Sequence, residues 1–185
     1  MKSAIGNRIT VSKKDKETII KISGTIEPWM NHALLGWLVM WTIMGAYVVY
    51  YVITGKTEGE NMFYFFLTYL AFWGYFEIKA FYSWMFRAYG YELVKITPSE
   101  IFVKRSLFGY GKSKRYDREN VKDFRKVETS RKSVNAAFNK SFWVMGNEQI
   151  EFDSLGQAYG FGMHLEEKER NELLVFLRRL LKKKV

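Results

Sequence analysis

The stretch PWMNHALLGWLVMWTIMGAYVVYYVITG, residues 28–55, decides the architecture of this chain of 185 residues. It holds no Asp, Glu, Lys or Arg over 28 consecutive positions. About 20 apolar residues in a helix suffice to cross the ~30 Å hydrocarbon layer of a bilayer. Core helices of soluble proteins seldom run so long without a charge, and no short basic leader or cleavage site accompanies the run. We therefore expect a transmembrane helix over residues 30–53.

A second run with few charges follows a short polar connection. Residues 62–76 are uncharged, Glu77 and Lys79 interrupt the run, and apolar residues then continue to Phe86. We predict a second spanning helix over residues 62–84, joined to the first by the glycine-containing segment 54–61. Together the two helices would form an antiparallel transmembrane hairpin within residues 28–87.

The distribution of Lys and Arg predicts the orientation of this hairpin. The connection between the helices carries only Lys56, beside Glu58 and Glu60, whereas basic residues are frequent on both outer flanks. Cytoplasmic flanks of membrane helices are enriched in Lys and Arg. We therefore expect a multi-pass protein whose N- and C-termini are both cytoplasmic.

The remainder of the chain is patterned as short strands and one helix. In residues 88–185, alternating segments separated by turn signals predict a small antiparallel sheet or barrel. Its expected strands are 91–96, 101–107, 114–116, 121–127, 141–145, 149–152 and 159–161. Leucines at helical spacing predict a C-terminal amphipathic helix over about 165–183. Residues 1–27 read as a β-hairpin too short to be stable alone, and we expect it to dock on the C-terminal domain.

This order of elements resembles bacterial PH-like membrane proteins, in which two N-terminal membrane helices precede a cytoplasmic PH-like domain. The layout is also similar to that of the photosystem I assembly factor of chloroplasts and cyanobacteria. The segment IEFDSLGQAYGFG, residues 150–162, and the helix after it support the resemblance. It implies a PH-like β domain, a bacterial inner-membrane location and a role as accessory, scaffold or assembly subunit.

Two groups of residues are candidates for contact with a partner or the membrane. The first lies on the second helix, where charged residues are costly and often functional: Glu77, Lys79, Phe65, Tyr69, Phe72, Trp73 and Phe76. These residues would dock on a larger integral membrane protein, or, for the two charged residues, join a buried polar network. The alternatives left open are interfacial anchoring for the two charges and lipid contact for the aromatic rings.

The second group is a basic segment within residues 104–132, which holds 11 basic and four acidic residues. Its members are Lys112, Lys114, Arg115, Arg118, Lys122, Arg125, Lys126, Arg131 and Lys132. Basic residues near an anionic bilayer surface are worth about 1 kcal/mol each. The segment would bind phospholipid headgroups or an acidic partner; a solvated strand face is the equally weighted alternative.

Composition and motifs argue against several other classes. The absence of Cys excludes disulfides, thiolate metal sites and Cys nucleophiles. The two His residues, His32 and His164, are not expected to form a metal or haem site. The sequence shows no recognisable set of nucleophile, base and orienting residue, no paired carboxylates in a recognisable frame, and no nucleic-acid-binding motif. We thus expect a non-enzyme with no cofactor, no metal and no nucleic-acid partner; the alternative to a complex subunit is a self-contained, membrane-tethered sensor of anionic headgroups.

Overall fold

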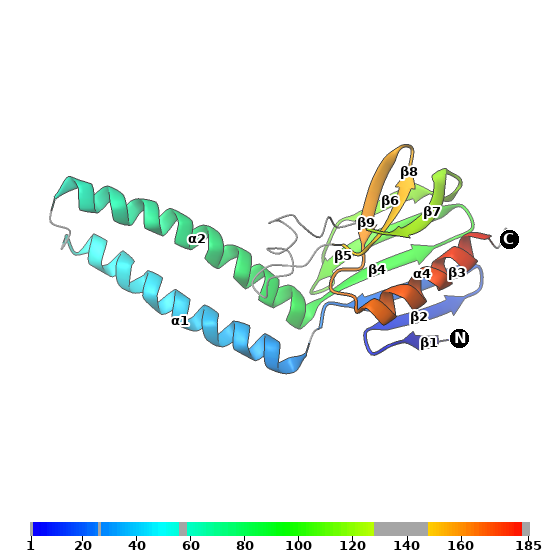
Figure 1. The fold of residues 1–185 in the computed structure, drawn as a ribbon, viewed down its shortest axis with the longest axis horizontal. Coiled ribbons are helices and arrows are strands. Elements are labelled where there is room, and N and C mark those ends of the chain that lie inside the picture. Colours follow the sequence, from blue (N-terminus) through cyan, green and yellow to red (C-terminus); the bar gives the residue numbers. More distant parts are fainter. Residues whose placement is uncertain (1, 26, 56–58, 128–147, 183–185) are drawn as a thin grey trace.

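The computed structural model describes residues 2–25, 27–55, 59–127 and 148–182. It is an α+β structure in which a long helical hairpin projects from a β-rich domain (Figure 1). The hairpin consists of α1 (Pro28–Ile53) and α2 (Glu60–Tyr89). The domain contains β1 (Lys2–Ile5), β2 (Ile9–Lys14), β3 (Glu17–Ser23), β4 (Gly90–Ile96), β5 (Glu100–Leu107), β6 (Ser113–Asp117), a 3-10 turn η1 (Arg118–Asn120), β7 (Val121–Lys126), β8 (Ile150–Ser154), β9 (Gln157–Phe161) and the C-terminal helix α4 (Glu167–Lys182).

Two antiparallel sheets make up the domain. The first is a six-stranded meander in the order β1-β2-β3-β4-β5-β6, and the second contains β7-β8-β9. Their facing sides share a core with α4, which includes the fully buried Ile20, Phe124, Phe152 and Leu177. Leucines at helical spacing form the buried stripe of α4, as the periodicity predicts.

The N-terminal strands belong to the main sheet. β3 pairs with β4 in antiparallel register, from Thr18 opposite Ile96 to Ser23 opposite Tyr91. The expected docking of residues 1–27 on the C-terminal domain is therefore confirmed, and it occurs through a shared sheet. As a consequence, residues 88–185 do not form the β domain by themselves, because the helical hairpin is inserted between two neighbouring strands.

Within the described residues every expected strand corresponds to an observed one, and one further strand is present. Strand β1 was not expected from the sequence. The strand expected at 149–152 pairs with β7 and with β9, and its expected partner at 141–145 lies outside the described residues. The described residues thus contain nine strands in two antiparallel sheets, which with the helices make an α+β structure.

The hairpin is held together along one narrow seam. α1 buries only Leu34, Leu38 and Gly45, at positions that fall on a single helical face. The α2 residues opposite include Ala80, which packs on the two leucines, and Trp73, whose Nε1–H donates to the carbonyl of Trp41 at 3.1 Å. The remaining faces of both helices are largely exposed.

Gly45 permits the closest approach in this seam. A β-carbon at this position would overlap the indole of Trp73, whereas a β-carbon on Gly36 would meet no atom within 4 Å. The two glycines lie on the same helix, so they differ in packing and not in helix propensity.

We predict that Gly45→Ala destabilises the hairpin by about 1–3 kcal/mol through overpacking against Trp73. Gly36→Ala is the matched control and should be neutral or slightly stabilising, because alanine favours helix more than glycine. Thermal unfolding of both variants in mild detergent, followed by circular dichroism, measures the difference. Equal melting temperatures for the two variants would contradict the close packing at Gly45.

Candidate functional site

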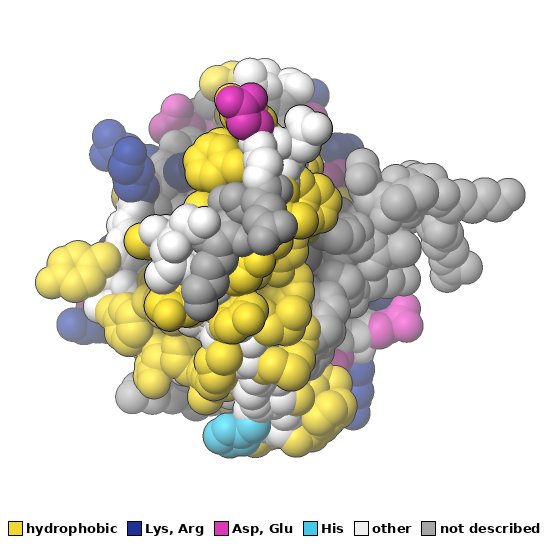
Figure 2. Space-filling model, turned by 90° about the vertical axis from the view of Figure 1, so that its left-hand side faces the viewer, with side chains coloured by type: hydrophobic (Ala, Val, Ile, Leu, Met, Phe, Trp, Pro, Cys, Tyr) yellow, Lys and Arg dark blue, Asp and Glu magenta, His cyan; other side chains and the backbone are white. Residues whose placement is uncertain are grey.

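The outer surface of the hairpin is mainly apolar. Viewed along the hairpin, hydrophobic side chains cover most of it (Figure 2). Large apolar residues are exposed on both helices, among them Ile43 and Tyr47 on α1 and Phe65, Phe72 and Ile78 on α2. By length and composition, α1 is the one helix among the described residues that could cross a membrane. The 30-residue α2 is long enough, but its tyrosines and charged residues make it more polar.

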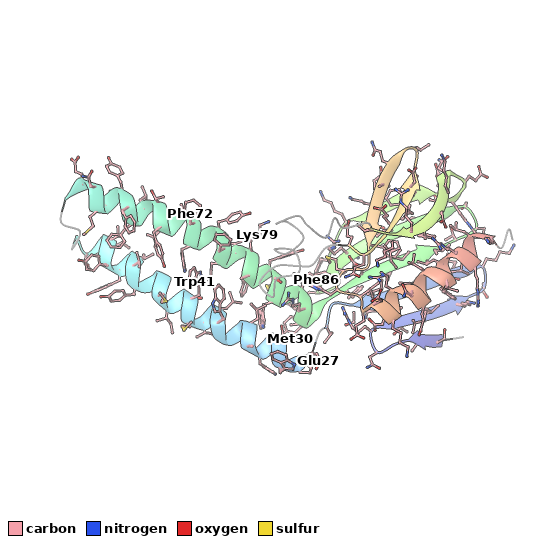
Figure 3. All side chains as sticks on the ribbon, in the orientation of Figure 1. Glu27, Met30, Trp41, Phe72, Lys79 and Phe86 are labelled. Atoms are coloured by element: carbon pink, nitrogen blue, oxygen red, sulfur yellow. The ribbon has the colours of Figure 1, made fainter. Side chains whose placement is uncertain are left out.

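The α2 residues singled out from the sequence divide between two sides of the helix. Phe65, Phe72 and Phe76 are exposed, and Lys79 extends outward with its ammonium 5.6 Å from the ring centroid of Tyr75. Figure 3 shows Phe72 and Lys79 on the side of α2 that faces away from α1. These four side chains are therefore available to lipid or to a partner.

Glu77 and Trp73 instead face α1, and Tyr69 is half-buried. The hydroxyl of Thr42 lies 2.7 Å from Oε1 of Glu77, near the middle of α1. Oε2 of Glu77 is buried and has no hydrogen-bond partner among the described residues. Glu77 thus serves contact between the two helices, whereas Lys79, two residues along, points elsewhere, as the i, i+2 spacing predicts.

The base of the hairpin passes into the sheet through two glycines. The N–H of Gly24 donates to the carbonyl of Gly90 at 2.9 Å, and a β-carbon on either residue would crowd Phe86. Phe86 is itself 2% exposed and lies where α2 meets the domain (Figure 3). The chain therefore leaves and re-enters the domain at one tightly packed point.

A buried polar cluster lies beside this base and joins three parts of the domain. Its centre is Glu92 of β4, which is 3% exposed. Oε1 of Glu92 accepts from Nε and Nη2 of Arg105 at 3.2 and 3.0 Å, and Oε2 accepts from the backbone N–H groups of Gly162 and Met163 at 2.6 and 3.1 Å. Glu92 thereby ties β4 and β5 to the connection between β9 and α4.

Arg8 extends the cluster to the N-terminal strands. Its guanidinium donates to the carbonyl of Ser23 at 2.9 Å and to the carbonyl of His164. Burial lowers the pKa of Arg8, while Glu169, Glu166 and Glu92 act in the opposite direction. Arg8 therefore holds the end of β3, just before α1, against the connection that leads into α4.

His164 adds an imidazole to this junction. Burial, followed by the positive charges of Arg87 and Arg8, lowers the pKa of its imidazole to about 4. Its backbone is in the left-handed region, with φ of 56°. An open cleft of about 980 Å³ lies next to it, bordered by Arg8, Glu27, Met30 and Glu169. This cleft adjoins the start of α1.

The basic segment does not form one surface. Antiparallel strands place Lys112 and Lys114 toward the hairpin, Arg118 and Lys122 toward the opposite end of the domain, and Arg125 and Lys126 back toward the hairpin. Several members have partners: Arg115 with Glu100, Arg125 with Glu151, Lys126 with Glu167, and Arg118 with the carbonyls of Thr97 and Leu180. Arg131 and Lys132 lie outside the described residues.

Arg8 and Glu92 were not predicted from the sequence, although a signal for Glu92 exists. In the segment YELVKI, residues 91–96, Glu92 shares the alternation phase of Val94 and Ile96, which are both buried. A carboxylate on the buried face of a strand requires partners. Arg8, by contrast, lies in a turn and gives no pattern of this kind.

Two further findings bear on the identity of the site. Within the described ranges, no group of three or more His, Asp or Glu side chains is arranged to hold a metal ion. Comparison of the chain with protein-family models, with curated proteins and with solved structures finds no match.

We predict that Glu92→Gln destabilises the domain by about 3 kcal/mol, because one amide cannot accept from both Arg105 and the two backbone donors. Glu148→Gln is the matched control: Glu148 also pairs with Arg105, at 3.1 Å, but its side chain is 43% exposed. Exposed ion pairs contribute little, so this variant should unfold like the wild type. Denaturant unfolding in detergent compares the two, and a similar small effect for both would refute the central role of Glu92.

We predict that stability falls as the pH drops from 6.5 toward 4. In this range the unfolded chain protonates His164 and the folded chain does not, so proton binding favours unfolding by up to about 3 kcal/mol. His164→Asn removes the titrating group and keeps a residue that tolerates the left-handed backbone. Melting temperatures measured between pH 4 and pH 7 should fall less steeply in the variant; identical slopes would exclude His164 as the source.

Proposed function

We propose that this chain is a non-enzymatic accessory, scaffold or assembly subunit of a larger membrane protein complex, anchored by its helical hairpin. The observation that carries the proposal is the exposed apolar surface of the hairpin beside a β domain with its own core. Soluble monomers rarely expose contiguous apolar patches beyond a few hundred Å². A bilayer, together with a membrane protein partner, would cover this surface.

Two alternative roles for α1 fit the structure less well. A core helix of a soluble domain would be buried, yet only three residues of α1 are. A cleaved signal sequence would take β1, β2 and β3 with it, because these strands precede α1 and β3 pairs with β4. An embedded hairpin accounts for both facts.

Two observations support the proposed orientation, one from the sheet and one from the charges. Pairing of β3 with β4 brings both flanks of the hairpin to one end, so both termini lie on the same side of a membrane that the hairpin crosses. Lys and Arg are frequent on these flanks, which favours the cytoplasmic side. With the resemblance to bacterial PH-like membrane proteins, this supports a multi-pass location in a bacterial inner membrane and a PH-like role for the domain.

The partner is proposed to contact the outward side of α2. Phe65, Phe72 and Phe76 present a row of rings there, and Lys79 adds a charge that can reach the interface along its flexible stem. Glu77 and Trp73 are directed toward α1, so they would support the shape of this surface without touching the partner.

Headgroup binding is the second candidate. Lys112 and Lys114 lie toward the hairpin and have no acidic partner among the described residues, which leaves both ammonium groups available to anionic lipid. The split of the basic segment between two ends of the domain restricts this role to a few residues.

We predict that a photo-crosslinking phenylalanine at position 65 or 72, in native membranes at native expression, joins the chain to one membrane protein that also co-purifies at fixed stoichiometry. Position 66 is the matched control. Phe66 is adjacent to Phe65 but contacts Tyr51 of α1, with ring centroids 5.7 Å apart. It should crosslink within the chain.

Two results would contradict the subunit proposal. One is a chain that purifies alone in mild detergent and forms no crosslink from position 65 or 72. The other is an equal pattern of crosslinks from positions 65 and 66, which would mean that the two sides of α2 are not distinct. A lone species would favour the headgroup-binding role.

A further inference from the structure

The turn between β5 and β6 exposes large aromatic residues at the foot of the hairpin. Leu107 and Tyr110 exchange two backbone hydrogen bonds, of 2.9 and 3.0 Å, around Phe108 and Gly109. Both central residues have positive φ, 52° for Phe108 and 87° for Gly109. Phe108 is 54% exposed and Tyr110 is 84% exposed.

A phenylalanine in this position is unfavourable on two counts. Turns with positive φ at both central residues prefer Gly, which has no β-carbon to crowd the following carbonyl, or Asn and Asp, whose side chains hydrogen-bond locally. Exposure of the ring to water adds to the cost. Residues held in unfavourable backbone conformations cluster at functional sites.

An aromatic path connects the turn to the hairpin. The ring of Phe108 stacks on Tyr89, with centroids 4.9 Å apart. Tyr89, the last residue of α2, in turn contacts Trp84 at 6.3 Å, and Trp84 contacts Phe81 at 5.9 Å. Through the half-buried Trp84, these ring contacts link the exposed Phe81 and Tyr89 of α2 to the turn on the β domain.

Lysines flank this aromatic surface. Lys104 donates from Nζ to the carbonyl of Gly109 at 2.9 Å, and Lys112 follows the turn with an exposed side chain. Tyr, Trp and Lys together are typical of the boundary between hydrocarbon and water, where rings enter the headgroup layer and ammonium groups meet phosphates.

We propose that the β5–β6 turn, residues 107–112, inserts Phe108 and Tyr110 into the headgroup layer of the bilayer and forms a second membrane anchor. This inference rests on the proposed embedding of the hairpin. The turn would hold the β domain against the lipid surface in a fixed orientation, so that the domain does not move freely about the end of α2.

A second turn in the same domain provides a matched control. Leu155 and Gly156, between β8 and β9, also have positive φ, 55° and 79°. Leu155 is 80% exposed, so it too presents an apolar side chain from a strained turn. Its strand neighbour Ser154 pairs with Val121, at the end of the domain away from the hairpin. We therefore expect Leu155 to remain in water.

The absence of Cys from the chain permits a direct test. Single-cysteine variants Phe108→Cys, Leu155→Cys and Ile43→Cys of the full-length protein would carry a nitroxide label in nanodiscs of phosphatidylethanolamine and phosphatidylglycerol. Collision rates with oxygen and with a water-soluble nickel chelate report depth. Ile43, exposed in the middle of α1, marks the hairpin itself.

We expect a deep label at position 43, a water-exposed label at position 155, and an intermediate depth at position 108 with nickel accessibility several-fold below that at 155. Tyr110→Cys provides a second probe that leaves Phe108 in place. Labels at 108 and 110 as accessible as at 155, with position 43 deep, would overturn the second anchor and leave the proposed hairpin intact. An accessible label at position 43 would refute the embedding and the anchor together.

Discussion

The pairing of β3 with β4 is the interaction on which the rest of the structure depends. These strands are neighbours in the sheet but are separated in sequence by the whole helical hairpin. Their ladder closes a loop of more than 60 residues. The entropy lost on closing this loop is reduced because the loop consists of two stiff helices that fold back on each other. The ladder brings the start of α1 and the end of α2 together at Gly24 and Gly90, so the hairpin grows from one point of the domain.

A junction of this kind needs polar as well as apolar support. Phe86 fills the space beside the two glycines, while Glu92 and Arg8 fix the adjoining loops. Burying a carboxylate is costly unless its charge is satisfied, and Glu92 receives two bonds from a guanidinium and two from backbone amides. The same bonds hold the start of α4 near the base of the hairpin.

Local patterns predicted most elements, because each depends on a periodicity that the residues themselves carry. The charge-free run ending at Gly55 predicted α1, the leucines near Leu177 predicted α4, and alternating segments predicted eight of the nine described strands. Strand β1 was missed because its four residues are too short to show alternation. The helix α2 was expected to end near residue 84 and continues to Tyr89, since the apolar pattern does not record where the following strand begins.

The sequence alone determined the long apolar helix, the helical hairpin, the antiparallel β character of the remainder and the amphipathic C-terminal helix. Only the tertiary structure decided which residues share a surface. The basic segment is continuous in sequence, yet antiparallel strands carry its members to opposite ends of the domain. Glu77 and Lys79 are two residues apart, yet one faces α1 and the other faces outward. Phe108 meets Tyr89 only because β4 and β5 lie side by side. Such contacts arise from strand pairing between distant segments, which one-dimensional periodicity does not encode.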